Sequence, residues 1–297
     1  MDIQATKPQI EMHLPKVGVN EVHVPVKYKR KDGGIVKLET IASMYVSLNA
    51  ETKGINMSRL SRILYSYLDT DKDISLDLME SILKDYKEKL GSKDSYLKFK
   101  FNYPIRKKSL ISDMSGWTYY PSVLEVQDVD DETKYTMRVA IYYSSTCPCA
   151  AHLGDLLRQR IVVRDGQEIS IDQLPREEQA HYANCTHGVP HAQRSRADIA
   201  IRFTKENPVW IEDVVSAIEA AIKVPVQVLV RREDEQEFSK LSAENPMFVE
   251  DAVRFMSETL DILPGVLDFS VVANHFENLH MSNAVAVNWK GIPGGLR

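Results

Sequence analysis

Apolar and polar residues alternate in the first part of the chain with the period expected of a half-buried strand. Every second residue from Val22 to Tyr28 is apolar, which predicts a strand over residues 21–31. Asp32-Gly33-Gly34 is a turn signal, and a second strand pattern covers residues 35–48. The chain is therefore expected to begin with a β-hairpin.

The period then changes from two to between three and four, which indicates helices. Apolar residues recur at helical spacing from Met57 to Tyr67, with Asn56 as a plausible N-cap. The next patterns predict a second helix over 75–90 and strands over 95–104 and 115–126. The first half thus has the order β-β-α-α-β-β.

An acidic segment at 128–132 separates this half from the next, and we expect a boundary there, giving units 1–127 and 128–297. In the second half, Glu206-Asn207-Pro208 and Glu244-Asn245-Pro246 each predict a helix start, with Asn as the cap and Pro as the first helical residue. Strands are predicted at 134–145, 196–204, 224–231, 266–273 and 284–289, with an insertion at about 150–190. The expected class is α+β, with two tandem β-β-α-α-β-β units whose antiparallel sheets are backed by helices.

Composition narrows the class of protein further. The chain has 37 Lys and Arg against 42 Asp and Glu, a net charge of −5 and 43% apolar residues, which is typical of a globular protein and predicts no nucleic-acid partner. Its first ten residues are polar, so we expect no secretory signal. No apolar run approaches 18 residues, so no membrane span is expected. Only three cysteines occur in 297 residues, which favours a reducing compartment, and we expect the cytoplasm.

The cysteines and half of the histidines gather in one window, between residues 147 and 191. Cys147-Pro148-Cys149 directly follows a predicted strand, where a thiolate could be held on a rigid turn. A closed four-cysteine zinc site is impossible within one chain, and the spacing is not the C-x-x-C of a redox pair. A catalytic metal site with three protein ligands and an inert thiol both remain open.

Two histidines lie at strand ends, where polar residues are more often functional. His191 lies a few residues before the strand predicted at 196–204, and His280 lies at a turn between two strands. The charged run 231–237 is expected to be a solvated loop after a strand. The histidines of the insertion, His152, His181 and His187, are expected to be surface residues or secondary contacts. Cys149 and Cys185 are also expected to take no part in the site.

No glycine-rich phosphate loop follows a predicted strand, so any nucleotide must be held by another device. Five segments, in order along the chain, carry a specific similarity: Lys16-Val17-Gly18-Val19, Lys53-Gly54-Ile55-Asn56-Met57-Ser58-Arg59, Thr146-Cys147-Pro148-Cys149, His191-Ala192-Gln193-Arg194-Ser195 and Glu244-Asn245-Pro246-Met247-Phe248-Val249-Glu250-Asp251. With these segments the sequence resembles the type IB GTP cyclohydrolases of the tunnelling-fold superfamily, and its β-β-α-α-β-β order agrees with that fold. In the second segment, Asn56 stands where many members of that family have His.

The resemblance implies a catalytic divalent metal bound by Cys147, His191 and Glu235. A mixed sulfur, nitrogen and oxygen set suits Zn²⁺, Mn²⁺ or Fe²⁺. It further implies that Glu250 anchors guanine and that His280 is the general acid and base.

Water attacks C8 of GTP in the implied reaction, which releases formate and gives 7,8-dihydroneopterin triphosphate for folate synthesis. The triphosphate would be held by basic residues of the matching segments, namely Lys53, Arg59 and Arg194. The resemblance also implies a homotetramer whose active sites are shared between subunits.

Two rival hypotheses come from other functional classes. A tunnelling-fold nitrile reductase would use Cys147 as a covalent nucleophile, with Glu250 still anchoring a purine. A non-catalytic purine-binding protein would need neither metal nor nucleophile. Metal content and formate release separate the three.

Overall fold

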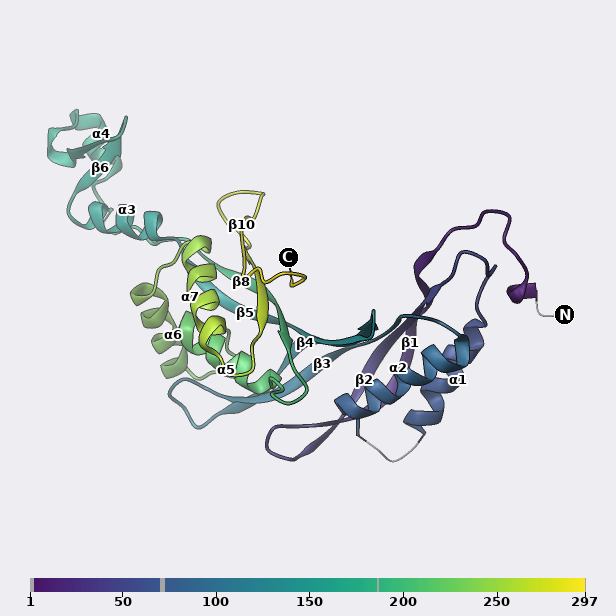
Figure 1. Ribbon diagram of the computed structural model, residues 1–297. Helices are drawn as coiled ribbons and strands as arrows, with labels where there is room; N and C mark the ends of the chain where they lie inside the picture. The colour runs from purple at the N-terminus through teal and green to yellow at the C-terminus, as the bar shows by residue number, and fades with distance from the viewer. Residues whose placement is uncertain (1–2, 70–72, 186, 297) are drawn as a thin grey trace.

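A computed structural model describes residues 3–69, 73–185 and 187–296, and its main feature is a long antiparallel sheet (Figure 1). In the described residues this sheet has eight strands in the order β1-β2-β3-β4-β5-β8-β9-β10. The strands are β1 (Leu14–Lys29), β2 (Ile35–Leu48), β3 (Ser95–Lys108), β4 (Ser115–Val129), β5 (Glu132–Thr146), β8 (Ala192–Phe203), β9 (Asp268–His275) and β10 (Ala284–Trp289).

Helices cover one face of this sheet. α1 and α2 pack against β1, β3 and β4, whereas α5 and α7 pack against β5, β9 and β10. The helices are α1 (Met57–Leu68), α2 (Leu76–Leu90), α3 (Pro148–Arg158), α4 (Arg176–His181), α5 (Ile211–Ile222), α6 (Arg232–Glu244) and α7 (Val249–Ile262). None of the helices in the described ranges is long and apolar enough to span a membrane.

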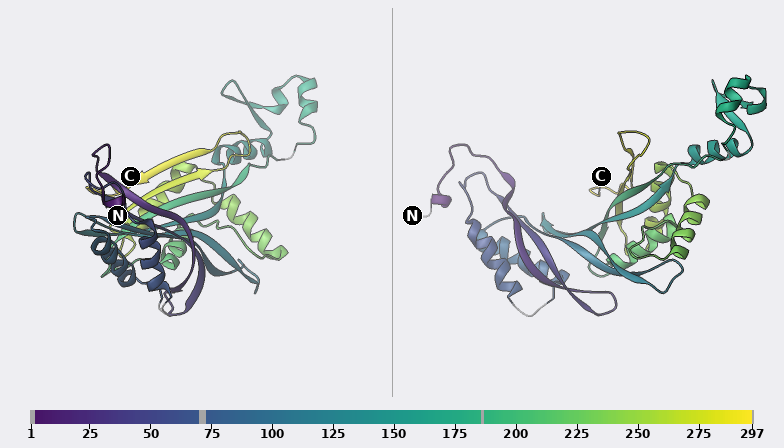
Figure 2. Two further views of the ribbon diagram at one scale, coloured as in Figure 1. Left: turned by 90° about the vertical axis from the view of Figure 1, so that its right-hand side faces the viewer. Right: turned by 180° about the vertical axis from the view of Figure 1, so that it is seen from behind.

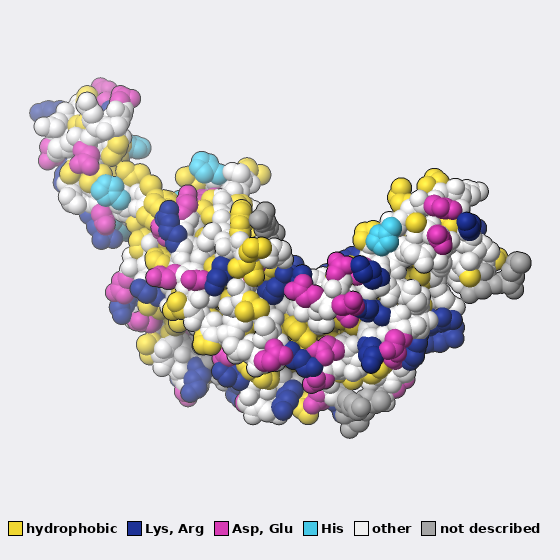
Figure 3. Space-filling view, in the orientation of Figure 1, with side chains coloured by type: hydrophobic (Ala, Val, Ile, Leu, Met, Phe, Trp, Pro, Cys, Tyr) yellow, Lys and Arg dark blue, Asp and Glu magenta, His cyan; other side chains and the backbone are white. Residues whose placement is uncertain are grey.

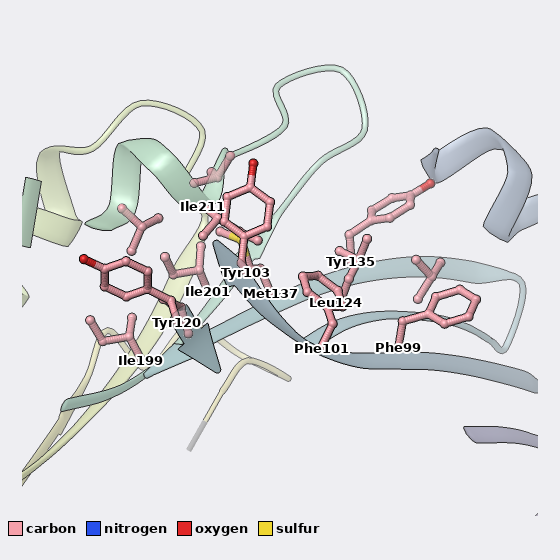
Figure 4. Packing of buried hydrophobic residues seen from close by; sticks show 14 of the residues in the cluster. Phe99, Phe101, Tyr103, Tyr120, Leu124, Tyr135, Met137, Ile199, Ile201 and Ile211 are labelled. Carbon is pink, nitrogen blue, oxygen red and sulfur yellow. The ribbon is translucent and has the colours of Figure 1, made fainter. Parts of the chain in front are cut away.

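The alternation along each strand explains which face the helices cover. On β3, Phe99 and Phe101 are buried while the residues that follow them, Lys100 and Asn102, are exposed, because successive side chains point to opposite faces. The buried rows of β3, β4, β5 and β8 join the helices in one continuous apolar cluster that runs through both halves of the chain (Figure 4). This core holds the strand ends of the second half in fixed positions.

The acidic segment between the two halves forms a tight hairpin turn between β4 and β5. Asp130 and Asp131 both have positive φ, at 52° and 61°, which short polar residues tolerate at such turns. Lys87 pairs with Asp131 at 3.1 Å, and Lys93 pairs with Asp130. The α+β class and the helix-backed antiparallel sheet are confirmed, while the division at 127/128 into tandem units stays a prediction because the sheet continues through it.

The two Asn-Pro motifs were wrongly interpreted as helix starts. α5 begins at Ile211 and α7 at Val249, each three residues after its proline, with Trp210 and Phe248 at the N-cap positions. Met247, the residue after Pro246, does not belong to the helix: its N–H donates to the Thr146 carbonyl at 3.0 Å. This hydrogen bond fastens the chain before α7 to the end of β5.

The strand predicted at 224–231 is also wrong. In the described residues, its backbone pairing with the sheet consists of the Ser144 N–H donating to the Val224 carbonyl and an isolated bridge at Pro225, whose missing N–H prevents a longer ladder. The charged run 231–237 is not a loop either, because α6 starts at Arg232 with three acids in its first turn, where the helix dipole favours them.

The insertion protrudes from the sheet as a small separate body (Figures 1 and 2). It contains α3, the hairpin of β6 (Ile161–Arg164) and β7 (Gln167–Ser170), a 3-10 turn at Ile171–Gln173, and α4. Val162, Ile171 and Leu174 form its own small apolar cluster.

The molecule is hollowed between its two ends, and charges of both signs are interspersed on the face shown in Figure 3.

Candidate functional site

Cys147 and His191 are brought together by neighbouring strand ends. Cys147 follows β5 and occupies the N-cap position of α3, and His191 directly precedes β8. Because β5 and β8 are antiparallel partners, the end of one meets the start of the other, and the Cys147 N–H donates to the His191 carbonyl at 3.1 Å. Both side chains are partly exposed, so they are accessible to a ligand.

Two further segments converge on the same edge of the sheet. The hydrogen bond from Met247 to Thr146 places the start of α7, which carries Glu250, beside Cys147. The Asn278 side chain donates to the Ala192 carbonyl at 2.6 Å, which ties the β9–β10 loop to the start of β8. His280 lies exposed on that loop, at the turn where the sequence predicted it.

The sequence analysis missed two residues that contact the His191 ring. Gln193 Oε1 lies 3.0 Å from His191 Nδ1, and Glu277 Oε2 lies 3.7 Å from the same nitrogen. Gln193 stands in the matching segment at 191–195, so its position there was a usable signal. Glu277 precedes His280 by three residues, and no local pattern distinguished it from a surface acid.

A buried histidine lies next to this edge. His275 is 2% exposed, its Nε2 lies 3.0 Å from Tyr143 Oη, and the rings are in edge contact. Burial lowers the pKa of His275 to about 4, and the neighbouring Glu250 carboxylate opposes this only in part. Burial also raises the pKa of Tyr143. Both groups are therefore neutral at pH 7.

We expect His275 to make the fold sensitive to acid. Its folded pKa is about 4 against an ordinary 6.5, so the unfolded chain binds this proton first and stability falls as the pH drops from 6.5 toward 4. Between pH 6.5 and 5 the loss is about 2 kcal/mol. Urea unfolding at both pH values should show this loss in the wild type and not in His275→Gln. The exposed His152→Gln is the control, and equal losses in wild type and His275→Gln would contradict the assignment.

Glu235 and Arg194 lie in an adjoining pocket rather than beside Cys147. The pocket has a volume of about 840 Å³ and is also lined by Tyr142, whose ring lies 5.7 Å from the Arg194 guanidinium. Among the neighbouring acids of α6, Glu235 lines this pocket and Glu233 and Glu237 do not. A second pocket, of about 620 Å³, lies over β1–β4 and contains none of the predicted site residues.

Asp234 fixes the start of α6, and with it the position of Glu235. It is fully buried, which raises its pKa, but its carboxylate accepts hydrogen bonds from Arg231, Ile111 and Ser112, and these hold the pKa far below its usual value. The ionised Asp234 therefore joins α6 to the loop between β3 and β4.

Within a single chain, the predicted ligand set is incomplete. No group of three or more His, Cys, Asp or Glu side chains in the described ranges is placed to hold a metal ion. The donor types do fit, because a thiolate and an imidazole are preferred ligands of zinc and other first-row metals. Cys147 also lies at the N-terminal end of α3, where the helix dipole is positive.

Lys53 and Arg59 lie far from this edge. They flank the start of α1, and α1 lies at the opposite end of the molecule in Figure 1 from α3, whose N-cap position is occupied by Cys147. Both are exposed, and Arg59 donates to the Lys89 carbonyl at 2.8 Å. One chain therefore cannot bring these two cations to a substrate bound beside Cys147.

Known structures with this arrangement define the class of fold. Uricase from Arthrobacter globiformis superposes with a TM-score of 0.52 over 95% of both chains at 9% identity. A highly active mutant of Bacillus sp. TB-90 urate oxidase gives 0.51 over 93% of this chain and 99% of its own, also at 9% identity. The chain thus has a urate-oxidase-like α+β fold.

Sequence similarity identifies the family. Residues 1–286 match the family described as type I GTP cyclohydrolase folE2. The GTP cyclohydrolase FolE2 of Paracoccus denitrificans is 38% identical over 94% of this chain and 78% of its own length, and that of Cereibacter sphaeroides is 37% identical over 94% and 70%. The chain belongs to the type I GTP cyclohydrolase FolE2 family. The expectation of a GTP cyclohydrolase of folate synthesis is confirmed at this level.

Proposed function

We propose that this member of the family is a type IB enzyme of the tunnelling-fold superfamily that converts GTP and water into formate and 7,8-dihydroneopterin triphosphate. The observation that carries the proposal is the convergence of four segments, which bear Cys147, His191, Glu250 and His280, at one edge of the sheet. Three of them belong to the motifs found in the sequence, and the fourth is the β9–β10 loop.

Cys147, His191 and Glu235 would hold one divalent metal, which can be Zn²⁺, Mn²⁺ or Fe²⁺. When bound, the metal would act as a Lewis acid that activates water for attack at C8 of the purine. The chain's own residues would then orient the base and move protons.

Glu250 would orient the guanine. It lies exposed in the first turn of α7. A carboxylate only accepts hydrogen bonds, so its two oxygens suit the N1–H and the exocyclic amino group of guanine. His280, on the loop between β9 and β10, would donate and accept protons as the imidazole ring of the substrate opens, because the two nitrogens of a histidine ring can act as donor and acceptor.

The remaining residues would come together on assembly. We propose a homotetramer in which Lys53 and Arg59 of one subunit reach the triphosphate bound at Cys147 of another, since the two regions lie at opposite ends of one chain. Arg194 would hold phosphate from the pocket it shares with Glu235. The exposed Glu235 would complete the metal site in the assembled enzyme.

Mixed oligomers test this sharing. Cys147→Ala and Arg59→Ala chains should each be inactive alone, and refolding them together should recover a measurable fraction of activity, because some mixed sites contain two intact contributions. Formate release from the mixture is the measurement. The control is a mixture of Cys147→Ala with His191→Ala. In the wild-type chain these two residues lie side by side and serve the same site, so every site of the mixture carries one of the two defects and activity should not be recovered. Equal behaviour of the two mixtures would show that the site is not shared in this way.

The reaction itself is tested by formate release from GTP before and after removal of metal. We expect activity to disappear on thorough chelation and to return on adding back Zn²⁺, Mn²⁺ or Fe²⁺ under anaerobic conditions. Full activity in metal-stripped protein would overturn the proposal and favour the nucleophile alternative. The absence of formate with metal restored would favour a non-catalytic purine-binding protein.

A further inference from the structure

A buried chain of hydrogen-bonded side chains leads away from His191 into the sheet. Gln193 Nε2 donates to Ser145 Oγ at 2.8 Å, and Ser145 Oγ lies 2.8 Å from Ser195 Oγ. Gln193, Ser145 and Ser195 are 5%, 1% and 0% exposed. The network is set by strand register, since Ser145 lies opposite Gln193 in the β5–β8 pair. Because a buried polar group is costly unless it is paired, these hydrogen bonds hold the three side chains in fixed orientations.

The contacts define which His191 nitrogen carries the proton. Glu277 lies 3.7 Å from Nδ1, and a carboxylate can only accept. Gln193 faces the same nitrogen with its carbonyl oxygen, because its amide nitrogen is directed at Ser145. The Gln193 oxygen is a hydrogen-bond acceptor at 3.0 Å, and the Glu277 carboxylate, at 3.7 Å, adds a longer-range attraction for a proton on the same nitrogen; both favour the Nδ1–H tautomer. The lone pair then lies on Nε2, at the opposite side of the ring.

We propose that Gln193 is a positioning residue that holds His191 in the Nδ1–H tautomer and presents Nε2 as the metal ligand. This inference rests on the proposed role of His191 in metal binding. Residues that orient a ligating histidine in this way typically contribute a factor of about 10 to 100 to metal affinity. Ser145 accepts a hydrogen bond from the Gln193 amide nitrogen, and the Glu277 carboxylate adds an electrostatic attraction for the Nδ1 proton.

Two substitutions at this position separate hydrogen bonding from packing. Gln193→Met fills a similar volume but cannot accept from Nδ1–H, and it leaves the hydroxyls of Ser145 and Ser195 paired with each other. Gln193→Glu keeps an acceptor at the same place. Gln127→Met, on β4 and remote from the site, is the matched control for replacing a glutamine in a strand.

The first readout is the affinity of the full-length protein for Co²⁺, titrated by its visible absorption. We expect Gln193→Met to bind Co²⁺ about 10 to 100 times more weakly than the wild type. Gln193→Glu and Gln127→Met should stay within about threefold, and melting temperatures should confirm that all variants are folded. Wild-type affinity in Gln193→Met, with binding lost in His191→Ala, would overturn the inference and leave His191 as a ligand.

The second readout is independent of metal. Ring ¹⁵N shifts of histidine-labelled, metal-free protein should show the Nδ1–H tautomer of His191 in the wild type and a mixture of tautomers in Gln193→Met. An unchanged tautomer in that variant would overturn the role of Gln193. If His191→Ala binds Co²⁺ as tightly as the wild type, the ligand assignment fails instead, and the ¹⁵N shifts still decide whether Gln193 orients the ring.

Discussion

Replacing Cys147 with alanine is expected to abolish metal binding and GTP turnover together. The thiolate would be one of three protein ligands, and even residues that only support a ligand contribute about 10- to 100-fold to affinity. Loss of the ligand itself should therefore weaken binding by more than about 100-fold. Metal content after purification and formate release from GTP measure the two effects on the same protein.

Cys185→Ala is the matched control, because this cysteine lies in the protruding insertion and should leave both quantities unchanged. The same pair of measurements separates the two possible roles of the Cys147 thiolate. If Cys147→Ala retains its metal and loses only turnover, the thiolate is a nucleophile, as in the nitrile reductase hypothesis. Retention of both metal and turnover would remove Cys147 from the site.

Glu250→Gln is expected to damage guanine recognition while leaving the metal in place. Hydrogen bonds to a charged group contribute about 1.5–3 kcal/mol each. Weakening two of them should lower kcat/KM for GTP by about 10²- to 10⁴-fold, at 1.4 kcal/mol per factor of ten. The substitution keeps the size of the side chain, so metal content should match that of the wild type.

Comparing GTP with inosine triphosphate tests whether Glu250 recognises the guanine base itself. Inosine triphosphate lacks the exocyclic amino group, so the wild type should prefer GTP, and Glu250→Gln should lose most of that preference. Glu258→Gln, an exposed acid farther along α7, is the control for charge on this helix and should keep wild-type kinetics. Unchanged turnover of GTP by Glu250→Gln would exclude Glu250 from the guanine site.

Strand ends were the most predictable part of the site. The alternating pattern before Cys147 and after His191 defined both residues as strand-end positions, and the structure confirms that placement. Alternation is predictable because it follows from the two-residue period of a strand, which depends only on nearby residues. The predicted start of α7 was wrong because the Met247 N–H is hydrogen-bonded to the end of β5, which is far away in the sequence. The strand predicted at 224–231 was wrong because Pro225 lacks the N–H that a longer ladder needs.

By itself, the sequence determined the residue types, the periods of the strands and helices, and the motifs that indicate the family. Only the tertiary structure decided which of the predicted residues meet, because this depends on strand order and register between positions far apart in the chain. It joined Cys147 to His191 through the β5–β8 pair and placed Glu235 in a neighbouring pocket. It also added Gln193 and Glu277 to the candidate site, because both lie against the His191 ring, and no local sequence pattern indicates these contacts.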